Sequence, residues 1–140
     1  LPGADQLIAR AFENAFSEVP VGGDTLIVVC TRGHAHDFTV VKKALETDAP
    51  YVGLLGSQRK RELFFKKLRA AGFSDNDFER VHTPVGLNIG AVTPREIAVS
   101  IVGELIEQRR LHGRKAGGRT AGRRSVTADG AMQAASPCAG

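Results

Sequence analysis

Two short apolar runs without polar alternation stand out in the first half of the chain. The first, T-L-I-V-V-C-T, covers residues 25–31, and the second covers residues 51–55. Runs of this length without alternation are typical of strands that are covered on both faces, as in a parallel sheet. A shorter run at 81–83 predicts a third strand.

Segments with helical spacing of apolar residues separate these runs. Asp37 is placed to cap a helix over 38–47, and Ser57 is placed to cap a second helix over 58–71 that Gly72 ends. A short helical turn is expected at 74–80. The inner faces of the two longer helices would carry Val40, Val41, Ala44, Leu45, Leu63, Phe64, Lys67 and Leu68.

A third long helix is predicted to begin at Pro94. Thr93 can accept the amide of Glu96, and the Glu96 carboxylate can reach back to the Thr93 amide, which is a capping box. Its spacing predicts an inner stripe of Ile97, Ile101 and Leu105 with the smaller Ala98 and Val102, and a solvent face of Arg95, Glu104 and Gln108.

The beginning of the chain is ambiguous. Residues 4–19 fit an amphipathic helix, but residues 6–10 could also form a strand that leads into a helix at 13–18. The remaining alternation of strands and helices predicts an α/β fold with a mostly parallel sheet and crossover helices. In such sheets ligands bind beyond the carboxyl ends of the strands, where the loops 31–37, 56–60 and 84–93 would converge.

Charge is distributed unevenly along the 140 residues. Residues 1–112 carry 14 basic and 14 acidic side chains, so residues 113–140 supply the whole net charge of +4. This last segment is rich in Gly, Ala and Ser and has no apolar periodicity, so we expect a folded domain over 1–112 and a disordered basic tail over 113–140. A basic run without aromatic residues gives little reason to expect specific nucleic-acid binding.

No apolar run is long enough for a membrane span, and no signal peptide is apparent, so we expect a cytoplasmic protein. Of the two cysteines, Cys30 is expected to be a buried thiol, and nothing in the sequence pairs it with Cys138.

Two of the three loops have the composition of an anion site. Loop 56–60, G-S-Q-R-K, combines a glycine, a hydroxyl, helix first-turn amides and two cations. In loop 84–93, Gly86 and Gly90 allow unusual backbone angles while Leu87 and Ile89 would anchor the loop inward, leaving free amides near a helix start. A tight connection without a ligand explains the second loop equally well.

Loop 31–37 carries two histidines, His34 and His36, but lacks the further ligands that a metal site requires. No nucleophile or paired base accompanies His34, so the sequence gives no catalytic residue and no metal site.

The three loop sequences T-R-G-H-A-H-D, Y-V-G-L-L-G-S-Q-R-K and V-H-T-P-V-G-L-N-I-G-A-V-T-P-R-E-I-A-V-S-I together resemble the Rossmann-like C-terminal domain of the XdhC/CoxI family. These proteins are accessory factors of xanthine dehydrogenase and related molybdenum hydroxylases. The resemblance covers about residues 1–110. It implies a binding protein that holds the molybdenum cofactor (molybdopterin), allows its sulfuration and hands it to the hydroxylase, with a cysteine desulfurase as a further partner.

The resemblance also implies which residues contact the cofactor, and it favours a strand at residues 6–10. The implied contacts are Thr31, Arg32, Gly33, His34, Asp37, Gly56, Ser57, Arg59, Lys60, Pro84, Gly86, Asn88, Gly90 and Thr93.

The chain also departs from the family pattern. It lacks the G-x-G-H turn with which family members usually begin this domain, and Gln58 and Asn88 stand where Arg and Asp are expected. A missing first strand would leave a sheet edge uncovered, so we expect a homo-oligomer or an additional segment to complete the sheet. The alternative function is an NAD(P)-dependent oxidoreductase domain, although no G-x-G-x-x-G motif is present.

Overall fold

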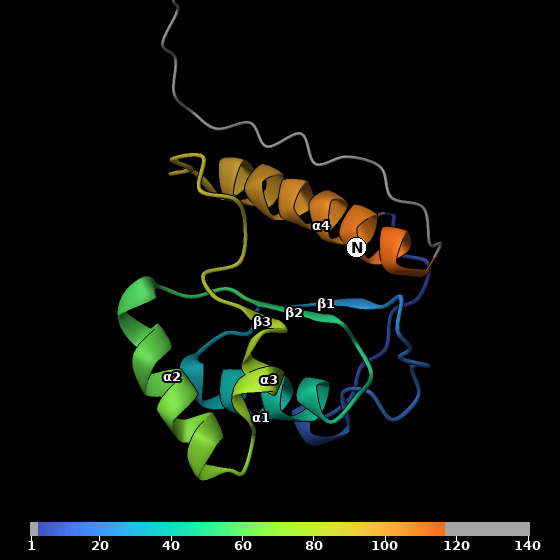
Figure 1. Ribbon diagram of the computed structural model, residues 1–140, viewed down its shortest axis with the longest axis vertical. Coiled ribbons are helices and arrows are strands. Elements are labelled where there is room, and N and C mark those ends of the chain that lie inside the picture. Colours follow the sequence, from blue (N-terminus) through green and yellow to red (C-terminus); the bar gives the residue numbers. More distant parts are fainter. Residues whose placement is uncertain (1–2, 117–140) are drawn as a thin grey trace, which may run out of the picture.

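The computed structural model describes residues 3–116, except for the side chains of His34, Lys60 and residues 114–116. Three strands, β1 (Leu26–Val29), β2 (Tyr51–Leu54) and β3 (Val81–His82), form a parallel sheet in the order β1-β2-β3 (Figure 1). The three apolar runs therefore form the strands that they predict, and all described strand pairs are parallel. Most of the expected tail, residues 117–140, lies outside the described residues.

Helices cover both faces of this sheet. The helices α1 (His34–Leu45), α2 (Gln58–Ala70) and α3 (Asp75–Phe78) lie on one face, and α4 (Pro94–Ala116) lies on the other (Figure 1). The expected three-layer α/β architecture is confirmed. The last helix is longer than expected, since it continues through Ala116.

The hydrophobic core lies between the sheet and the layer of α1 and α2. Ile27, Val52 and Val81 are register partners on neighbouring strands, and all three are buried. Val41, Ala44 and Leu45 of α1 and Leu68 of α2 complete this buried cluster. Burial of such side chains is the main stabilising contribution to a domain of this size.

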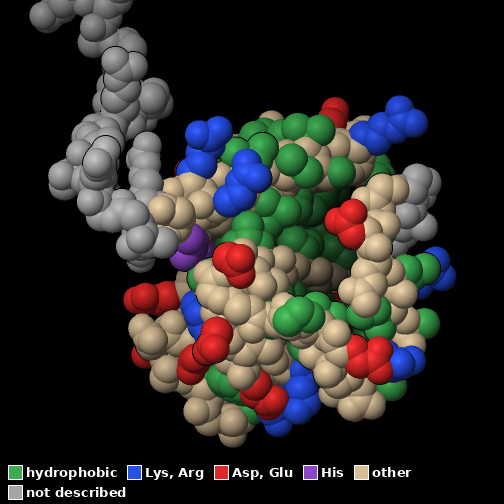
Figure 2. Space-filling model, turned by 90° about the vertical axis from the view of Figure 1, so that its right-hand side faces the viewer, with side chains coloured by type: hydrophobic (Ala, Val, Ile, Leu, Met, Phe, Trp, Pro, Cys, Tyr) green, Lys and Arg blue, Asp and Glu red, His purple; other side chains and the backbone are tan. Residues whose placement is uncertain are grey.

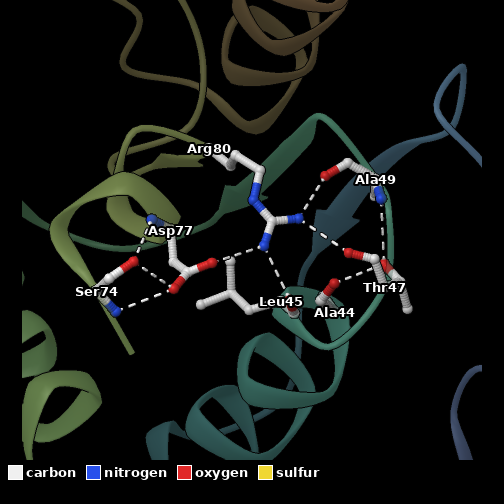
Figure 3. A network of polar contacts seen from close by, with 7 residues as sticks. All are labelled: Ala44, Leu45, Thr47, Ala49, Ser74, Asp77 and Arg80. Carbon is white, nitrogen blue, oxygen red and sulfur yellow. Dashed lines mark hydrogen bonds and ion pairs between the residues drawn. The ribbon is translucent and has the colours of Figure 1, made fainter. Parts of the chain in front are cut away.

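Arg80, at the start of β3, ties the amino end of the sheet to the end of α1 (Figure 3). Its guanidinium donates to the carbonyl oxygens of Leu45, Thr47 and Ala49, each at 2.9 Å, and to the Asp77 carboxylate at 3.0 Å. The carbonyls at a helix C-terminus have no partner within the helix, so a cation placed there satisfies them.

The expectation of a strand at residues 6–10 is wrong. This segment is extended without strand pairing, and it leads into the short 3-10 helix η1 (Phe12–Asn14). The Phe12 ring stacks on the His36 ring of α1, with 4.5 Å between ring centroids. Leu7 is mostly exposed, so the segment has too few buried contacts to fix it against the sheet.

Helix α1 begins four residues earlier than predicted, at His34 instead of Phe38. Gly33, with φ of 102°, lets the chain turn from β1 directly into the helix. Asp37 therefore lies inside the first turn and does not cap it. Its carboxylate accepts a hydrogen bond from the Thr31 hydroxyl at 2.5 Å.

Helix α4 begins as predicted. The Thr93 hydroxyl accepts the Glu96 amide at 3.3 Å, and the Thr93 amide donates to the Glu96 carboxylate at 2.8 Å. The predicted capping box is confirmed.

The orientation predicted for the rest of α4 is wrong in part. Glu104, expected in solvent, is only 7% exposed, whereas Val102, expected inside, is 54% exposed. Ala98 is also exposed, while Ile97, Ile101 and Leu105 are half-buried. The sheet presents polar groups to α4, so the side of the helix that carries Glu104 turns inward.

Three further burial predictions are also wrong. Leu63 and Lys67, expected on the inner face of α2, are exposed. Cys30 follows β1 and is exposed, because the run leaves the sheet after Val29. Leu87 and Ile89 of the glycine-rich loop are 40% and 55% exposed instead of anchored inward.

Candidate functional site

A pocket lies beyond the carboxyl ends of the strands, as expected for a parallel sheet. Its volume is about 230 Å³, and it is open to solvent on one side. The strand ends, the turn after β2, the beginning of α1 and the first three turns of α2 contribute its lining: Asp37, Phe38, Leu54, Leu55, Gly56, Ser57, Arg61, Leu63, Phe64, Lys67 and Thr83.

Polar groups converge at the base of this pocket. Asp37 is buried and bonded to Thr31, so the end of β1 and the first turn of α1 are held together. Thr83 follows β3 and is also buried. A Cβ on Gly56 would lie 3.4 Å from the Thr83 hydroxyl oxygen, so the turns after β2 and β3 approach closely. Hydroxyl and carboxylate groups in such a place can fix the orientation of a ligand.

Aromatic and cationic side chains form the walls of the pocket. The Phe38 and Phe64 rings meet edge to face, with 6.0 Å between centroids and an interplanar angle of 75°. Arg61 and Lys67 of α2 contribute two exposed cations. A mainly apolar pocket with cations at its edge suits a flat heterocycle that carries an anionic group.

The structure brings only some of the predicted site residues to this pocket. Asp37, Gly56 and Ser57 line it, and Thr31 is joined to it through Asp37. Ser57 is the N-cap residue of α2, but its hydroxyl accepts no hydrogen bond from the first turn of that helix. Arg32, Gly33 and Arg59 are exposed and do not contribute to the lining. The side chains of His34 and Lys60 lie outside what the structure describes.

Most of the lining was not predicted from the sequence. The additional lining residues are Phe38, Leu54, Leu55, Arg61, Leu63, Phe64, Lys67 and Thr83. Lys67 had a detectable signal, because it lies seven residues after the loop cation Lys60 and so falls on the same side of the helix, two turns further on. Phe38 and Phe64 gave no such signal, since apolar helix positions are usually core positions.

The rest of the glycine-rich loop, from Gly86 to Thr93, does not join the pocket lining. Gly86 and Gly90 have φ of 105° and 72°, so the predicted backbone angles are confirmed. The expected contacts Pro84 and Asn88 do not line the pocket either.

Several amides of this loop are already bonded to carboxylates of α4. The Gly86 amide donates to the Glu104 carboxylate, and the amides of Val92 and Thr93 both donate to Glu96 at 2.8 Å. Two carboxylates of α4 therefore hold the loop in place. The prediction of free amides is therefore wrong for Gly86, Val92 and Thr93.

Glu104 joins this loop to the sheet on the face opposite α1 and α2. Its carboxylate lies 2.8 Å from His82 Nδ1, and the Tyr51 ring lies against the His82 ring with 4.5 Å between centroids. The Tyr51 hydroxyl is buried and makes no hydrogen bond with the residues that the structure describes. Burial and the negative charge of Glu104 raise the pKa of Tyr51 above its usual value.

The fold and pocket define a class: a Rossmann-like α/β domain with a ligand pocket at the carboxyl edge of its parallel sheet. Residues 1–105 match the XdhC Rossmann domain. The chain belongs to this family.

Two relatives have names that indicate a function. The chain is 38% identical over 109 residues to a probable xanthine dehydrogenase subunit of Bacillus subtilis (strain 168), covering 78% of this chain and 31% of that protein. It is 28% identical over 98 residues to the molybdenum cofactor insertion chaperone PaoD of Escherichia coli (strain K12), covering 70% of this chain and 30% of PaoD.

A crystal structure of a xanthine dehydrogenase from Bacillus halodurans has the same fold. The TM-score is 0.61 at 30% sequence identity, with 77% of this chain and 30% of that chain covered. The chain therefore spans about a third of the length of these proteins. None of the helices that the structure describes is long and apolar enough to cross a bilayer.

Proposed function

We propose that this domain binds the molybdenum cofactor during maturation of xanthine dehydrogenase or a related molybdenum hydroxylase, as a binding domain and not as a catalyst. The names of the relatives support the role, and the pocket supports the ligand. The observation that carries the proposal is the pairing of an apolar, aromatic-walled pocket with two cations on one helix.

The residues present fit the chemistry of this cofactor. Its pterin is a flat heterocycle with polar edges, and its side chain ends in a phosphate. In the proposed complex the ring packs against the wall formed by Phe38 and Phe64, and the polar edge meets Ser57, Thr83 and the Asp37–Thr31 pair. Arg61 and Lys67 bind the phosphate, which a cation pair does most effectively where water is partly excluded.

This arrangement shifts the anion contacts along α2 relative to the sequence-based prediction. Arg59 is exposed outside the pocket lining, and the amides of the glycine-rich loop are bonded to carboxylates. The loop then acts by positioning Thr83 and the end of β3, while phosphate binding falls to Arg61 and Lys67. When bound, the cofactor supplies molybdenum chemistry to the recipient enzyme, and this chain supplies binding, orientation and shelter from water.

The test is the amount of cofactor retained by protein purified anaerobically from a host that makes molybdopterin. Arg61→Ala with Lys67→Ala is expected to lower the retained amount by tenfold or more, measured by mass spectrometry of released small molecules. The matched control, Lys42→Ala with Lys43→Ala, removes two cations from α1 and should leave retention unchanged. Absence of molybdopterin from the unmodified protein, or equal loss in both variants, would contradict the proposal.

The same preparation tests the oxidoreductase alternative. Titration with NADH should produce no saturable change in nicotinamide fluorescence, whereas saturable binding that displaces molybdopterin would favour the alternative. Two expectations from the sequence remain predictions. One is that a cysteine desulfurase is a partner, and the other is that a second copy or a further segment completes the sheet. Co-purification and sedimentation analysis of the full-length protein test them.

A further inference from the structure

Resting on the function proposed above, we propose that the basic surface of α2 docks an acidic surface of the protein that receives the cofactor. This basic surface consists of the exposed side chains Arg59, Arg61, Lys66, Lys67 and Arg69. It adjoins the pocket, because Arg61 and Lys67 belong to both. The docked partner would therefore lie at the mouth from which the ligand leaves.

Charge is strongly segregated within the folded part of the chain. Helix α2 carries six cations and one acid, Glu62, although residues 1–112 as a whole are balanced at 14 of each sign. The rest of that segment is therefore acidic, with 8 cations and 13 acids. A helix that concentrates the positive charge of an otherwise acidic domain produces a local positive potential, which steers association with a negative surface.

Two of the arginines are ordered by aromatic rings before any partner binds. A second, shallow pocket is lined by Arg61, Phe65, Arg69, Asp75, Phe78 and Glu79. The Arg61 guanidinium lies 5.3 Å from the Phe65 ring centroid, and the Arg69 guanidinium lies 5.0 Å from the Phe78 ring centroid. The Phe65 and Phe78 rings contact each other at 5.1 Å between centroids.

This ordering favours carboxylate recognition. A guanidinium that is already held over a ring loses less conformational entropy when it pairs with a carboxylate, and Arg is enriched among the residues that dominate interface energies. Arg69 already makes such a pair within the chain, with Asp75 Oδ1 at 2.9 Å and 3.2 Å from two of its nitrogens. The surface therefore has the geometry and the sign to bind further carboxylates.

A protein partner fits this surface better than a nucleic acid. The faces of Phe65 and Phe78 are engaged by arginines, so they are not open platforms for bases. A combination of arginines and aromatic rings is typical of a protein interface.

The experiment measures binding of the unmodified chain and of charge-reversal variants to the cofactor-free molybdenum hydroxylase of the same organism, at several salt concentrations. Lys66→Glu with Arg69→Glu changes two residues that do not line the cofactor pocket. We expect the dissociation constant to rise tenfold or more at low salt, and the difference to shrink as salt rises. The cofactor content of the variant, measured separately, should equal that of the unmodified chain.

The matched control is Arg95→Glu with Arg109→Glu, which makes the same charge change on exposed positions of α4, across the sheet from α2. Lys66→Glu with Ala70→Glu serves as a second variant that leaves the Arg69–Asp75 pair intact. Both of its positions are exposed, so folding should be retained. Its dissociation constant should also rise several-fold.

Three outcomes would overturn the proposal. These are a salt-independent affinity, equal weakening by the α4 control, and tighter binding of a single-stranded RNA 20-mer that the α2 variants abolish. If the unmodified chain holds no cofactor but binds the hydroxylase through α2, the proposed function fails while this docking surface stands.

Discussion

The two faces of the sheet are built in different ways. On the face covered by α1 and α2, neighbouring strands present Ile27, Val52 and Val81 to a buried apolar cluster. On the face covered by α4, β2 and β3 present Tyr51, Gly53 and His82, and His82 makes a polar contact with Glu104 of α4. The first face supplies most of the stability of the domain, whereas the second positions the glycine-rich loop.

Close approach also distinguishes the face covered by α4. The Leu87 amide donates to the Ser100 carbonyl oxygen at 3.1 Å, and a Cβ on Gly103 would lie 3.0 Å from a Leu87 methyl carbon. Several apolar side chains of α4 are not used in these contacts and are exposed: Val99, Val102, Ile106 and Leu111. Figure 2, in which α4 stays uppermost, shows hydrophobic side chains over this part of the molecule and in the hollow beneath it.

The largest effect is expected from truncating the apolar face. Leu68 is fully buried, so Leu68→Ala should lower the free energy of unfolding by about 2–5 kcal/mol through lost burial and the cavity left behind. Chemical denaturation, monitored by circular dichroism, measures this change in the free energy of unfolding. Leu63→Ala on the same helix is the control, because Leu63 is 58% exposed and should cost well under about 1 kcal/mol. Equal costs would mean that the apolar cluster is not the main source of stability.

Next in size is Gly86→Ala, which tests the close approach of the loop to α4. The added Cβ would overlap the Ser100 hydroxyl, and φ of 105° is strained for any residue with a Cβ. We expect the free energy of unfolding, measured by thermal or chemical denaturation, to fall by about 2–3 kcal/mol. Gly90→Ala has only the strained φ, with no atom within 4 Å of the new Cβ, so about 1–2 kcal/mol is expected there. A larger loss at Gly90 would contradict the packing of Gly86 against α4.

Glu104→Gln tests the polar connection itself. The Gln side chain has one acceptor oxygen, so when this oxygen accepts the Gly86 amide, its NH2 group faces His82 and forces the tautomer with an unprotonated Nδ1. We expect a loss of about 1–3 kcal/mol and faster hydrogen exchange at the Leu87 amide, which Ser100 holds. Glu104→Gln should lower the free energy of unfolding less in the His82→Ala variant than in the unmodified protein, because the two side chains share one contact. Additive losses would show that they act independently.

The smallest effect is expected from Tyr51→Phe at neutral pH. The free energy of unfolding should change by less than about 1 kcal/mol, because the hydroxyl that is removed is buried without a partner among the described residues. At alkaline pH the two proteins should diverge. The folded-state pKa of Tyr51 lies above its unfolded value near 10, so folding favours the protonated form. The unmodified protein then loses up to about 1.4 kcal/mol of stability per pH unit above pH 10. The Phe variant should lack this loss. If both proteins lost stability equally as the pH rises above 10, the raised pKa of Tyr51 would be contradicted.

The strands and the helix order could be read from the sequence because apolar periodicity and capping residues are local signals. The uninterrupted runs around Val28 and Val52 and the Thr93–Glu96 capping box are examples. The burial of Glu104 could not be read this way. Its partners, His82 and the Gly86 amide, are 22 and 18 residues away and meet it only in the folded sheet.

The residues of the candidate site could likewise be predicted only as far as local sequence signals reach. Loop glycines and neighbouring cations indicated the edge of the sheet at which a pocket lies, and Gly56, Ser57 and Asp37 line that pocket. Which cation of α2 points toward the pocket depends on how that helix packs, so Arg61 and Lys67 replaced Arg59. The start of α1 was misplaced because Gly33 with a positive φ allows a helix to begin without a side-chain cap.

The most direct test of cofactor binding is a nuclear magnetic resonance titration of the isotope-labelled protein with molybdopterin under anaerobic conditions. We predict saturable backbone shifts at Phe38, Gly56, Ser57, Phe64 and Thr83, around the pocket beside the α1 and α2 layer. Little change is expected in residues 88–93 and along α4. Shifts confined to that loop and α4, or no saturable shifts at all, would contradict binding of the cofactor in this pocket.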